Sequence, residues 1–273
     1  MKLYRLGSVG SAVVLVWFWF MQQSSLRAES ASPSPLTAQE IIGKAVARSQ
    51  QGPPAGHTGF TYTKVSVTEE FNGSGKVKER KEKVYEVSFR DGASSTRLLE
   101  VNGRAPGEGE LKNFNYKRPE HGTNTSPNQH LHQTNRDIVL TPQVAERFKF
   151  ELGNETIIDG RRTYVLAFKA KVPALPAHGL VERFLDHLTG QLWIDAEEFE
   201  IARVEAQLGS KVELLGGIIG SLRKMAYTMT RTRVAEGVWL NNFSSGEFEG
   251  RKILEPLHIK TRTEASNFKP AGI

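Results

Sequence analysis

The feature that most constrains the fold is an alternation of side chains with a period of two residues, which begins near Gly59. Residues 60–68 alternate in this way, and residues 77–89 do so again after the tetrapeptide Asn72-Gly73-Ser74-Gly75. A period of two predicts β-strands, and Asn-Gly between two such runs predicts a hairpin. Similar runs follow along the rest of the chain, so we expect about nine or ten antiparallel strands.

Helical periodicity is confined to a few short segments. Thr37 and Glu40 form a predicted capping box, and residues 41–46 form an apolar stripe behind it. Residues 108–117 and 141–148 predict two further short helices. One alternating sheet with so few helices predicts an α+β, mainly β fold. We expect a curved antiparallel sheet that forms a half-open barrel, with the helices covering its concave face.

The chain of 273 residues contains no cysteine. Disulfides, thiolate metal sites and cysteine nucleophiles are therefore excluded. Hydrophobic residues make up 38% of the chain, which is enough to bury a core in one large domain or two small ones. With 24% charged residues, this composition excludes a multi-span membrane protein, a collagen and a wholly disordered chain.

The N-terminus has the pattern of an export signal. Lys2 and Arg5 precede an apolar run at residues 12–21, and small or polar residues follow it. The run is shorter than the roughly 20 residues that span a bilayer. We therefore expect cleavage after Ala28 or Ser30 and a periplasmic location, with an uncleaved inner-membrane anchor as the alternative.

The expected organisation is a signal at residues 1–30, a linker at 31–36, one domain at 37–268 and a tail at 269–273. Within the domain, residues 115–136 predict a polar insertion. The net charge is +6, but three of the 36 basic residues lie before residue 29, which leaves 33 against 30 acidic residues after cleavage at Ala28. Acidic and basic residues also alternate along the chain, so we expect no nucleic-acid partner.

Motifs for catalysis are missing. The sequence has no G-x-S-x-G nucleophile elbow, no phosphate-binding glycine loop and no H-E-x-x-H zinc motif. His130 and His132 would share a face if they lay on a strand, but a metal site also needs a third ligand and supporting hydrogen bonds. A solvated loop accounts for this pair, so we expect no metal and no other cofactor.

Four acidic residues lie close together in one predicted hairpin turn, at Asp195, Glu197, Glu198 and Glu200. Two of them could in principle form the carboxylate pair of a glycosidase. Because all four lie in the same turn, we expect their charges simply to solvate its tip. No assembled nucleophile and base remain, so we expect the protein not to be an enzyme.

Two groups of large apolar residues share a face at strand spacing. They are Tyr164, Leu166 and Phe168 in one run and Met225, Tyr227 and Met229 in another. In a half-open barrel such side chains either fill the core or line a cavity of lipid size, and methionine suits an adaptable surface. The spacing alone leaves both interpretations open.

The segment Gly190-Gln191-Leu192-Trp193-Ile194-Asp195, followed by residues 199–205, resembles the glycine–tryptophan–aspartate hairpin of the LolA-like superfamily. These are periplasmic outer-membrane lipoprotein-sorting proteins. Residues 158–166 resemble the strand pair that precedes that hairpin in the family. The resemblance covers most of residues 36–268. By residue-wise match, the hairpin positions are Trp193, Asp195, Ile201 and Arg203, which it implies are structural.

The resemblance implies an incomplete antiparallel barrel whose helices cover a hydrophobic cavity, which in the lipoprotein carrier holds acyl chains. The polar insertion at 115–136 and the charged first hairpin depart from that carrier. We therefore expect a non-catalytic periplasmic protein that binds lipid or lipoprotein acyl chains, with an envelope protein as a further partner. The alternative is a structural or interaction protein with a filled barrel, which contacts its partner through the polar loop.

Overall fold

The computed structural model describes residues 35–51, 59–90, 93–117, 140–177, 179–214, 220–252 and 255–271. The chain divides into two compact units, Met1–Leu36 and Thr37–Ile273, and the account below concerns the second. The predicted signal, most of the linker and residues 118–136 of the polar insertion lie outside the described residues. His130 and His132 lie there too. No helix in the described part of the chain is long and apolar enough to cross a membrane.

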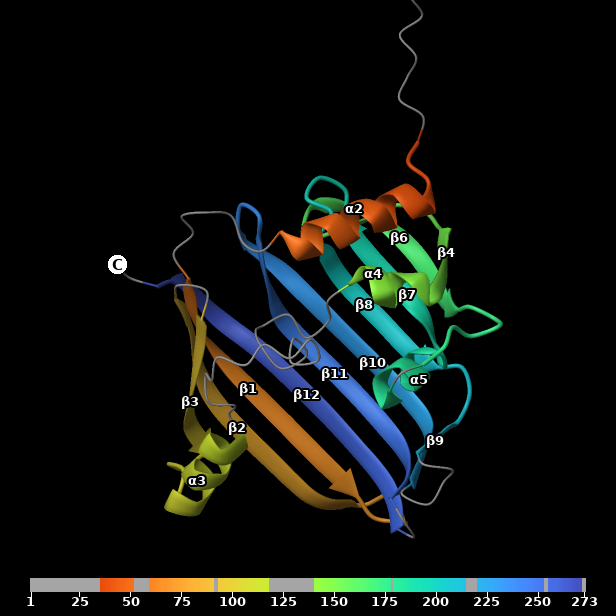
Figure 1. The fold of residues 1–273 in the computed structure, drawn as a ribbon. Helices are drawn as coiled ribbons and strands as arrows, with labels where there is room; N and C mark the ends of the chain where they lie inside the picture. Colours follow the sequence, from red (N-terminus) through yellow and green to blue (C-terminus); the bar gives the residue numbers. More distant parts are fainter. Residues whose placement is uncertain are drawn as a thin grey trace, which may run out of the picture. The chain divides into compact units, whose positions relative to one another are not determined.

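One antiparallel sheet of twelve strands dominates the fold (Figure 1). The strands are β1 Phe60–Phe71, β2 Val77–Arg90, β3 Ala93–Val101, β4 Phe148–Leu152, β5 Thr156–Ile158, β6 Arg161–Ala170, β7 Leu188–Asp195, β8 Ile201–Leu208, β9 Val212–Leu214, β10 Gly220–Ala235, β11 Val238–Lys252 and β12 Glu255–Pro270. Their order is β3-β2-β1-β12-β11-β10-β8-β7-β6-β4, with β5 beside β6 and β9 beside β10. β3 and β4 are the two edge strands of this order, so the sheet is open. This confirms the predicted half-open fold.

The sequence predicted the long hairpins correctly and missed the shortest strands. Asn72 and Gly75 form the predicted turn between β1 and β2, and Glu236-Gly237 joins β10 to β11. β5 and β9 have three residues each, which is too short for a period of two to be recognised. β12 continues to Pro270, opposite Phe60, and so passes the expected end of the domain at residue 268.

Four helices lie in the described part of the chain: α2 Ala38–Gln50, α3 Glu108–Lys117, α4 Pro142–Glu146 and α5 Leu180–Leu185. The predicted capping box begins α2, where the Glu40 N–H donates to Thr37 Oγ1 at 3.3 Å and the Thr37 N–H donates to Glu40 Oε2 at 2.8 Å. The stripe of α2 is buried at Ile41, Ile42 and Ala45. α2 packs against β4 and α4, and Figure 1 shows α2, α4 and α5 on one side of the sheet.

The two faces of the sheet differ in burial. We call the face that carries Leu166, Leu192, Val204 and Met229 the inner face; the four residues stand directly opposite one another on β6, β7, β8 and β10. Each is at most 5% exposed. The opposite, outer face carries polar side chains at the intervening positions, for example Gln191, which is exposed. This alternation places one part of the core between the helices and β6, β7, β8 and β10. A second buried cluster lies on β1, β2 and β11 and consists of Phe60, Tyr62, Val87, Val238 and Leu240.

Glycines let β10 and β11 approach each other closely. A Cβ atom on Gly250 would lie 2.1 Å from the carbonyl oxygen of Ser221, and one on Gly220 would lie 2.3 Å from that of Arg251. The register between the two strands also shifts between Leu222 and Lys224. Bulges and glycines at such positions bend the strands. They allow the long β10–β11 hairpin to follow the curvature of the sheet.

Candidate functional site

All six predicted cavity residues lie on the inner face. Tyr164, Leu166 and Phe168 come from β6, whereas Met225, Tyr227 and Met229 come from β10. Leu166 and Met229 are 0% exposed and Phe168 and Met225 are 7% exposed, so these four are core side chains. Tyr164 and Tyr227 are only half-buried. The inner face therefore combines a packed part with a part whose side chains keep some exposed surface.

A hollow of about 380 Å³ opens beside these strands. Its lining includes Ala167, Gln191, Glu205 and Thr228, four residues that stand directly opposite one another on the outer face. Of the six predicted cavity residues, only Tyr227 lines it. Most of its lining lies on the outer face, so this hollow is not the cavity that the sequence predicted on the inner face.

The acidic turn between β7 and β8 corrects a prediction. Glu197 is exposed, as expected, with 77% of its side chain accessible. Asp195 is 0% exposed and Glu200 is 8% exposed, so the charges of the turn do not simply solvate its tip. The prediction was wrong because the partners that make burial tolerable are arginines from distant parts of the sequence.

Asp195 joins the turn to the start of β6. Arg161 donates from Nε and Nη2 to the two carboxylate oxygens at 2.6 and 2.9 Å, and the backbone N–H groups of Glu197 and Glu198 donate to Oδ1 at 3.1 and 2.7 Å. Burial alone would raise the pKa of Asp195, but the hydrogen bonds from Arg161 and the backbone outweigh it and hold the pKa below its usual value. The carboxylate therefore connects Arg161 of β6 to two backbone N–H groups of the turn.

Glu198 connects the same turn to the β10–β11 hairpin. Its carboxylate accepts hydrogen bonds from Arg233 Nε at 2.7 Å and from Trp239 Nε1 at 2.6 Å. Burial would raise the pKa of Glu198, whereas the bonds from Arg233, Trp239 and the Gly237 N–H lower it below its usual value. These contacts fix the relative position of two hairpins, which is a structural role.

Glu200 connects the sheet to α2. It pairs with Arg231 at 2.7 Å and with Arg48 at 3.1 Å, and all three side chains are at most 15% exposed. Arg48 also donates to the carbonyl oxygen of Gly237 at 2.6 Å. Each charge of this buried group therefore has an opposite charge beside it, as burial requires.

The remaining hairpin residues identified by resemblance lie on both faces. Ile201 is 6% exposed and stands opposite Ile194 in the core. On the outer face the Arg203 guanidinium lies 5.0 Å from the centre of the Trp193 ring, and Arg203 also pairs with Glu205. A cation over an aromatic ring covers the apolar surface of the tryptophan from water.

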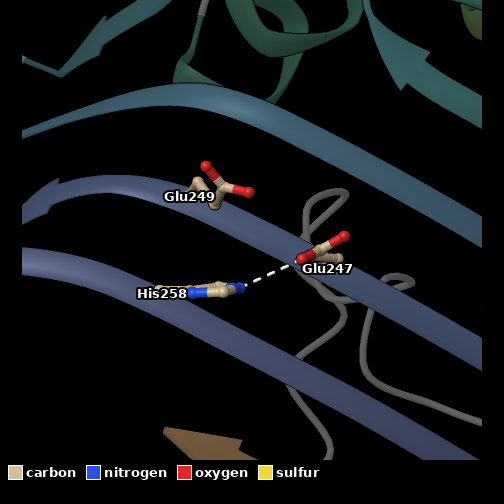
Figure 2. A group of neighbouring side chains, drawn as sticks. All are labelled: Glu247, Glu249 and His258. Atoms are coloured by element: carbon tan, nitrogen blue, oxygen red, sulfur yellow. Dashed lines mark hydrogen bonds and ion pairs between the residues drawn. The ribbon is translucent and has the colours of Figure 1, made fainter. Parts of the chain in front are cut away.

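Sequence analysis missed a cluster of possible metal ligands formed by Glu247, Glu249 and His258 (Figure 2). Their ligand atoms all lie within 4.8 Å of one another, and His258 Nε2 lies 3.0 Å from Glu247 Oε1. His258 lies on the strand after the two glutamates, and only the register of β11 against β12 brings the three side chains together. The spacing Glu247-x-Glu249 on a strand was the signal available in the sequence.

A serine–histidine contact also appears without forming a catalytic triad. His187 Nδ1 lies 2.6 Å from Ser210 Oγ on the exposed surface. The neighbouring Asp186 does not orient the imidazole; it accepts a hydrogen bond from the buried Arg147 at 2.8 Å. Asp186 therefore does not serve as the third group that positions a catalytic base.

No family model and no curated protein match the chain. The chain is similar to the solved structure of a LolA superfamily protein from Nitrosomonas europaea, with 14% identity, a TM-score of 0.33 and coverage of 88% of this chain and 96% of that chain. It is also similar to an outer-membrane lipoprotein-sorting protein domain, described as putative, from Vibrio parahaemolyticus, with 12% identity, a TM-score of 0.38 and coverage of 85% and 91%.

A third similar structure is the complex of MucA and MucB from Pseudomonas aeruginosa, with 11% identity, a TM-score of 0.23 and coverage of 86% and 99%. The family expected from the hairpin motif is thus named among these structures. At such identities and TM-scores, the likeness carries no argument about function. The function is therefore argued below from the residues themselves.

Proposed function

We propose that the protein is a non-catalytic binding protein of the periplasm that holds a lipid or lipoprotein acyl chain on the inner face of its sheet. The observation that carries this proposal is an apolar row across β10, β11 and β12. Met225 stands opposite Phe248, and Phe248 stands opposite Ile259. Met225 is 7% exposed, whereas Phe248 and Ile259 are only half-buried. An acyl chain lying along this row would bury their remaining apolar surface.

A second row on the same face, four residues further along β10 and beyond the Tyr227–Gly246 pair, suits the polar end of an amphipathic ligand. Met229 stands opposite Ser244, Ser244 opposite Thr263, and Thr263 opposite Ser66. Ser66 and Thr263 share a hydrogen bond at 3.2 Å, and all three hydroxyl side chains keep some exposed surface. Small hydroxyl groups beside an apolar row offer both kinds of contact that a lipid with a polar head requires.

The six predicted cavity residues take different parts in this proposal. Leu166, Phe168, Met225 and Met229 form the packed wall behind the ligand, since they are buried already. Tyr227 contacts the ligand from the half-buried part of β10. Tyr164 stacks on Phe199 with ring centres 6.4 Å apart, at the side of the wall near α2.

The first test is native mass spectrometry of protein purified from its own envelope, where a discrete added mass of lipid or lipopeptide size is expected. The second uses a fluorescent fatty acid and a matched pair of variants on adjacent residues of β10. Tyr227→Glu places a charge on the inner face, and Thr228→Glu places the same charge on the outer face. Loss of one aromatic contact is worth about 1.5–3 kcal/mol, so Tyr227→Glu should weaken probe binding by about 10- to 100-fold.

Thr228→Glu should bind the probe like the wild type, and both variants should melt near the wild-type temperature because neither side chain is fully buried. A bare polypeptide mass together with no uptake of the fatty acid would overturn the proposal. Equal binding by the two variants would overturn the assignment of the ligand to the inner face.

The second candidate is a structural or interaction protein of the envelope, favoured by the burial of four of the six predicted cavity residues. In that case the sheet is a filled scaffold and the polar insertion at 115–136 contacts an envelope partner. Deletion of residues 119–135 would then abolish capture of that partner and leave the melting temperature unchanged. Partner capture that survives the deletion would argue against this candidate.

A further inference from the structure

The outer face of β11 and β12 carries a mixed group of one imidazole and two carboxylates. Glu249 stands directly opposite His258, and Glu247 lies two residues before Glu249, so all three side chains are on the same face. Figure 2 shows Glu247 and His258 pointing toward each other, with Glu249 beside them. We propose that these three side chains bind a divalent transition-metal ion of the Zn²⁺ type.

The donor set fits this class of ion. Zn²⁺ binds imidazole nitrogen and carboxylate oxygen at about 2.0–2.2 Å, and two ligands of a tetrahedral ion therefore lie about 3.4 Å apart. His258 Nε2 and Glu247 Oε1 already lie 3.0 Å apart. The whole group spans up to 4.8 Å, so the third ligand has to move inward by somewhat more than 1 Å. Rotation of the half-buried Glu249 side chain provides such a movement without a change in the backbone.

Neighbouring side chains restrict the positions of two of the proposed ligands, His258 and Glu247. The Phe71 ring stacks on the His258 imidazole with ring centres 4.4 Å apart, which limits the orientations of the imidazole. The Glu247 carboxylate is held in turn by its contacts with His258 Nε2 at 3.0 Å and Lys260 Nζ at 3.4 Å.

A lysine ammonium already occupies the position of a cation in this group. Lys224 Nζ lies 2.9 Å from Glu249 and 3.3 Å from Glu247, and so bridges the two carboxylates. Lys260 Nζ approaches Glu247 at 3.4 Å from the other side. The side chain of Lys224 is 54% exposed and long, and exposed ion pairs of this kind are weak. A divalent ion can therefore displace Lys224 into solvent, and the lysine acts as a built-in competitor for the site.

The competition between the Lys224 ammonium and the metal ion suggests the most specific variant for the test, Lys224→Met. Isothermal titration calorimetry with Zn²⁺ on the full chain, after removal of bound metal with a chelator, should detect a site at micromolar concentrations. Glu249→Gln and His258→Ala should each weaken binding at least tenfold. Lys224→Met removes the competing ammonium but no ligand, so it should tighten binding about fivefold or more. Melting temperatures identify any variant that fails to fold.

The controls address other histidines of the chain. The double variant His130→Ala with His132→Ala, and the single variant His187→Ala, should bind Zn²⁺ like the wild type. Zinc binding that survives His258→Ala but is lost in one of these controls would overturn the proposal, as would the absence of any uptake. Binding weakened by Lys224→Met would also overturn it. The site lies on the outer face, so fatty-acid binding and zinc binding can fail independently.

Discussion

Replacement of Asp195 by asparagine tests how the buried charge of the β7–β8 turn contributes to stability. The asparagine carbonyl can still accept the backbone N–H groups of Glu197 and Glu198, but its amide N–H₂ would then face Arg161. The hydrogen bond of 2.6 Å from Arg161 Nε is lost, and the one of 2.9 Å from Nη2 keeps only a neutral acceptor; a hydrogen bond to a charged group is worth about 1.5–3 kcal/mol. Arg161 is 22% exposed and keeps Glu197, which recovers part of this loss. We expect the free energy of unfolding to fall by about 3 kcal/mol.

The matched control is Glu197→Gln, because Glu197 pairs with the same arginine from an exposed position. Exposed ion pairs contribute about 0–1 kcal/mol, so this variant should unfold almost like the wild type. Urea titration at pH 7, followed by fluorescence and circular dichroism, measures both variants. Asp195→Asn should also lower the melting temperature by about 6–12 °C. Equal losses in the two variants would refute the argument that burial makes the Asp195 pair the stronger one.

The same pair predicts a pH dependence. The pKa of Asp195 in the folded protein lies below its ordinary value of 3.8, so the unfolded state binds the proton more readily. The stability contributed by Asp195 is therefore fully present above the unfolded pKa and is lost as the pH falls through the folded pKa. The difference between wild type and Asp195→Asn should be constant from pH 6 to 8 and should shrink below about pH 4. A difference that grows on acidification would contradict this sign.

Three further substitutions test other contacts. Gly190→Ala would place a Cβ 1.9 Å from the carbonyl oxygen of Glu205, so forcing β7 and β8 apart should cost about 1–3 kcal/mol in a urea titration; a wild-type midpoint would contradict it. Arg147→Met leaves the carboxylates of Glu182 and Asp186 without their buried partner, and residues 175–186 should become sensitive to limited proteolysis. Thr37→Ala removes the N-cap of α2 and should cost about 1 kcal/mol; no change in stability would count against the capping box.

The strand architecture could be predicted from sequence because its signals are local. Alternation around Leu192 and Ile194 identifies which residues face the core, and Asn72-Gly73 identifies a turn without knowledge of the rest of the chain. The capping box at Thr37 and Glu40 is equally local. Each of these predictions depends on residues within a few positions of one another, and each agrees with the structure.

The environment of the acidic turn could not be predicted, because it depends on contacts between distant segments. Glu197 and Glu198 are neighbours in sequence, yet one is exposed and the other accepts hydrogen bonds from Arg233 and Trp239. Nothing within the turn distinguishes these two carboxylates. Only the pairing of β8 with β10, and of β10 with β11, places the arginine and the tryptophan beside Glu198.

The two proposed sites depend on the same property of one strand, namely which residues of β11 face which side. Glu247 and Glu249 face outward with His258, and Phe248 between them faces inward with Met225 and Ile259. A shift of one residue would exchange these faces and destroy both sites. The Phe248 ring lies over Gly246, where a Cβ would be 2.6 Å from the ring, so this position of the ring requires glycine at residue 246. A fatty-acid probe and zinc therefore report on opposite faces of one strand, and each provides the control for the other.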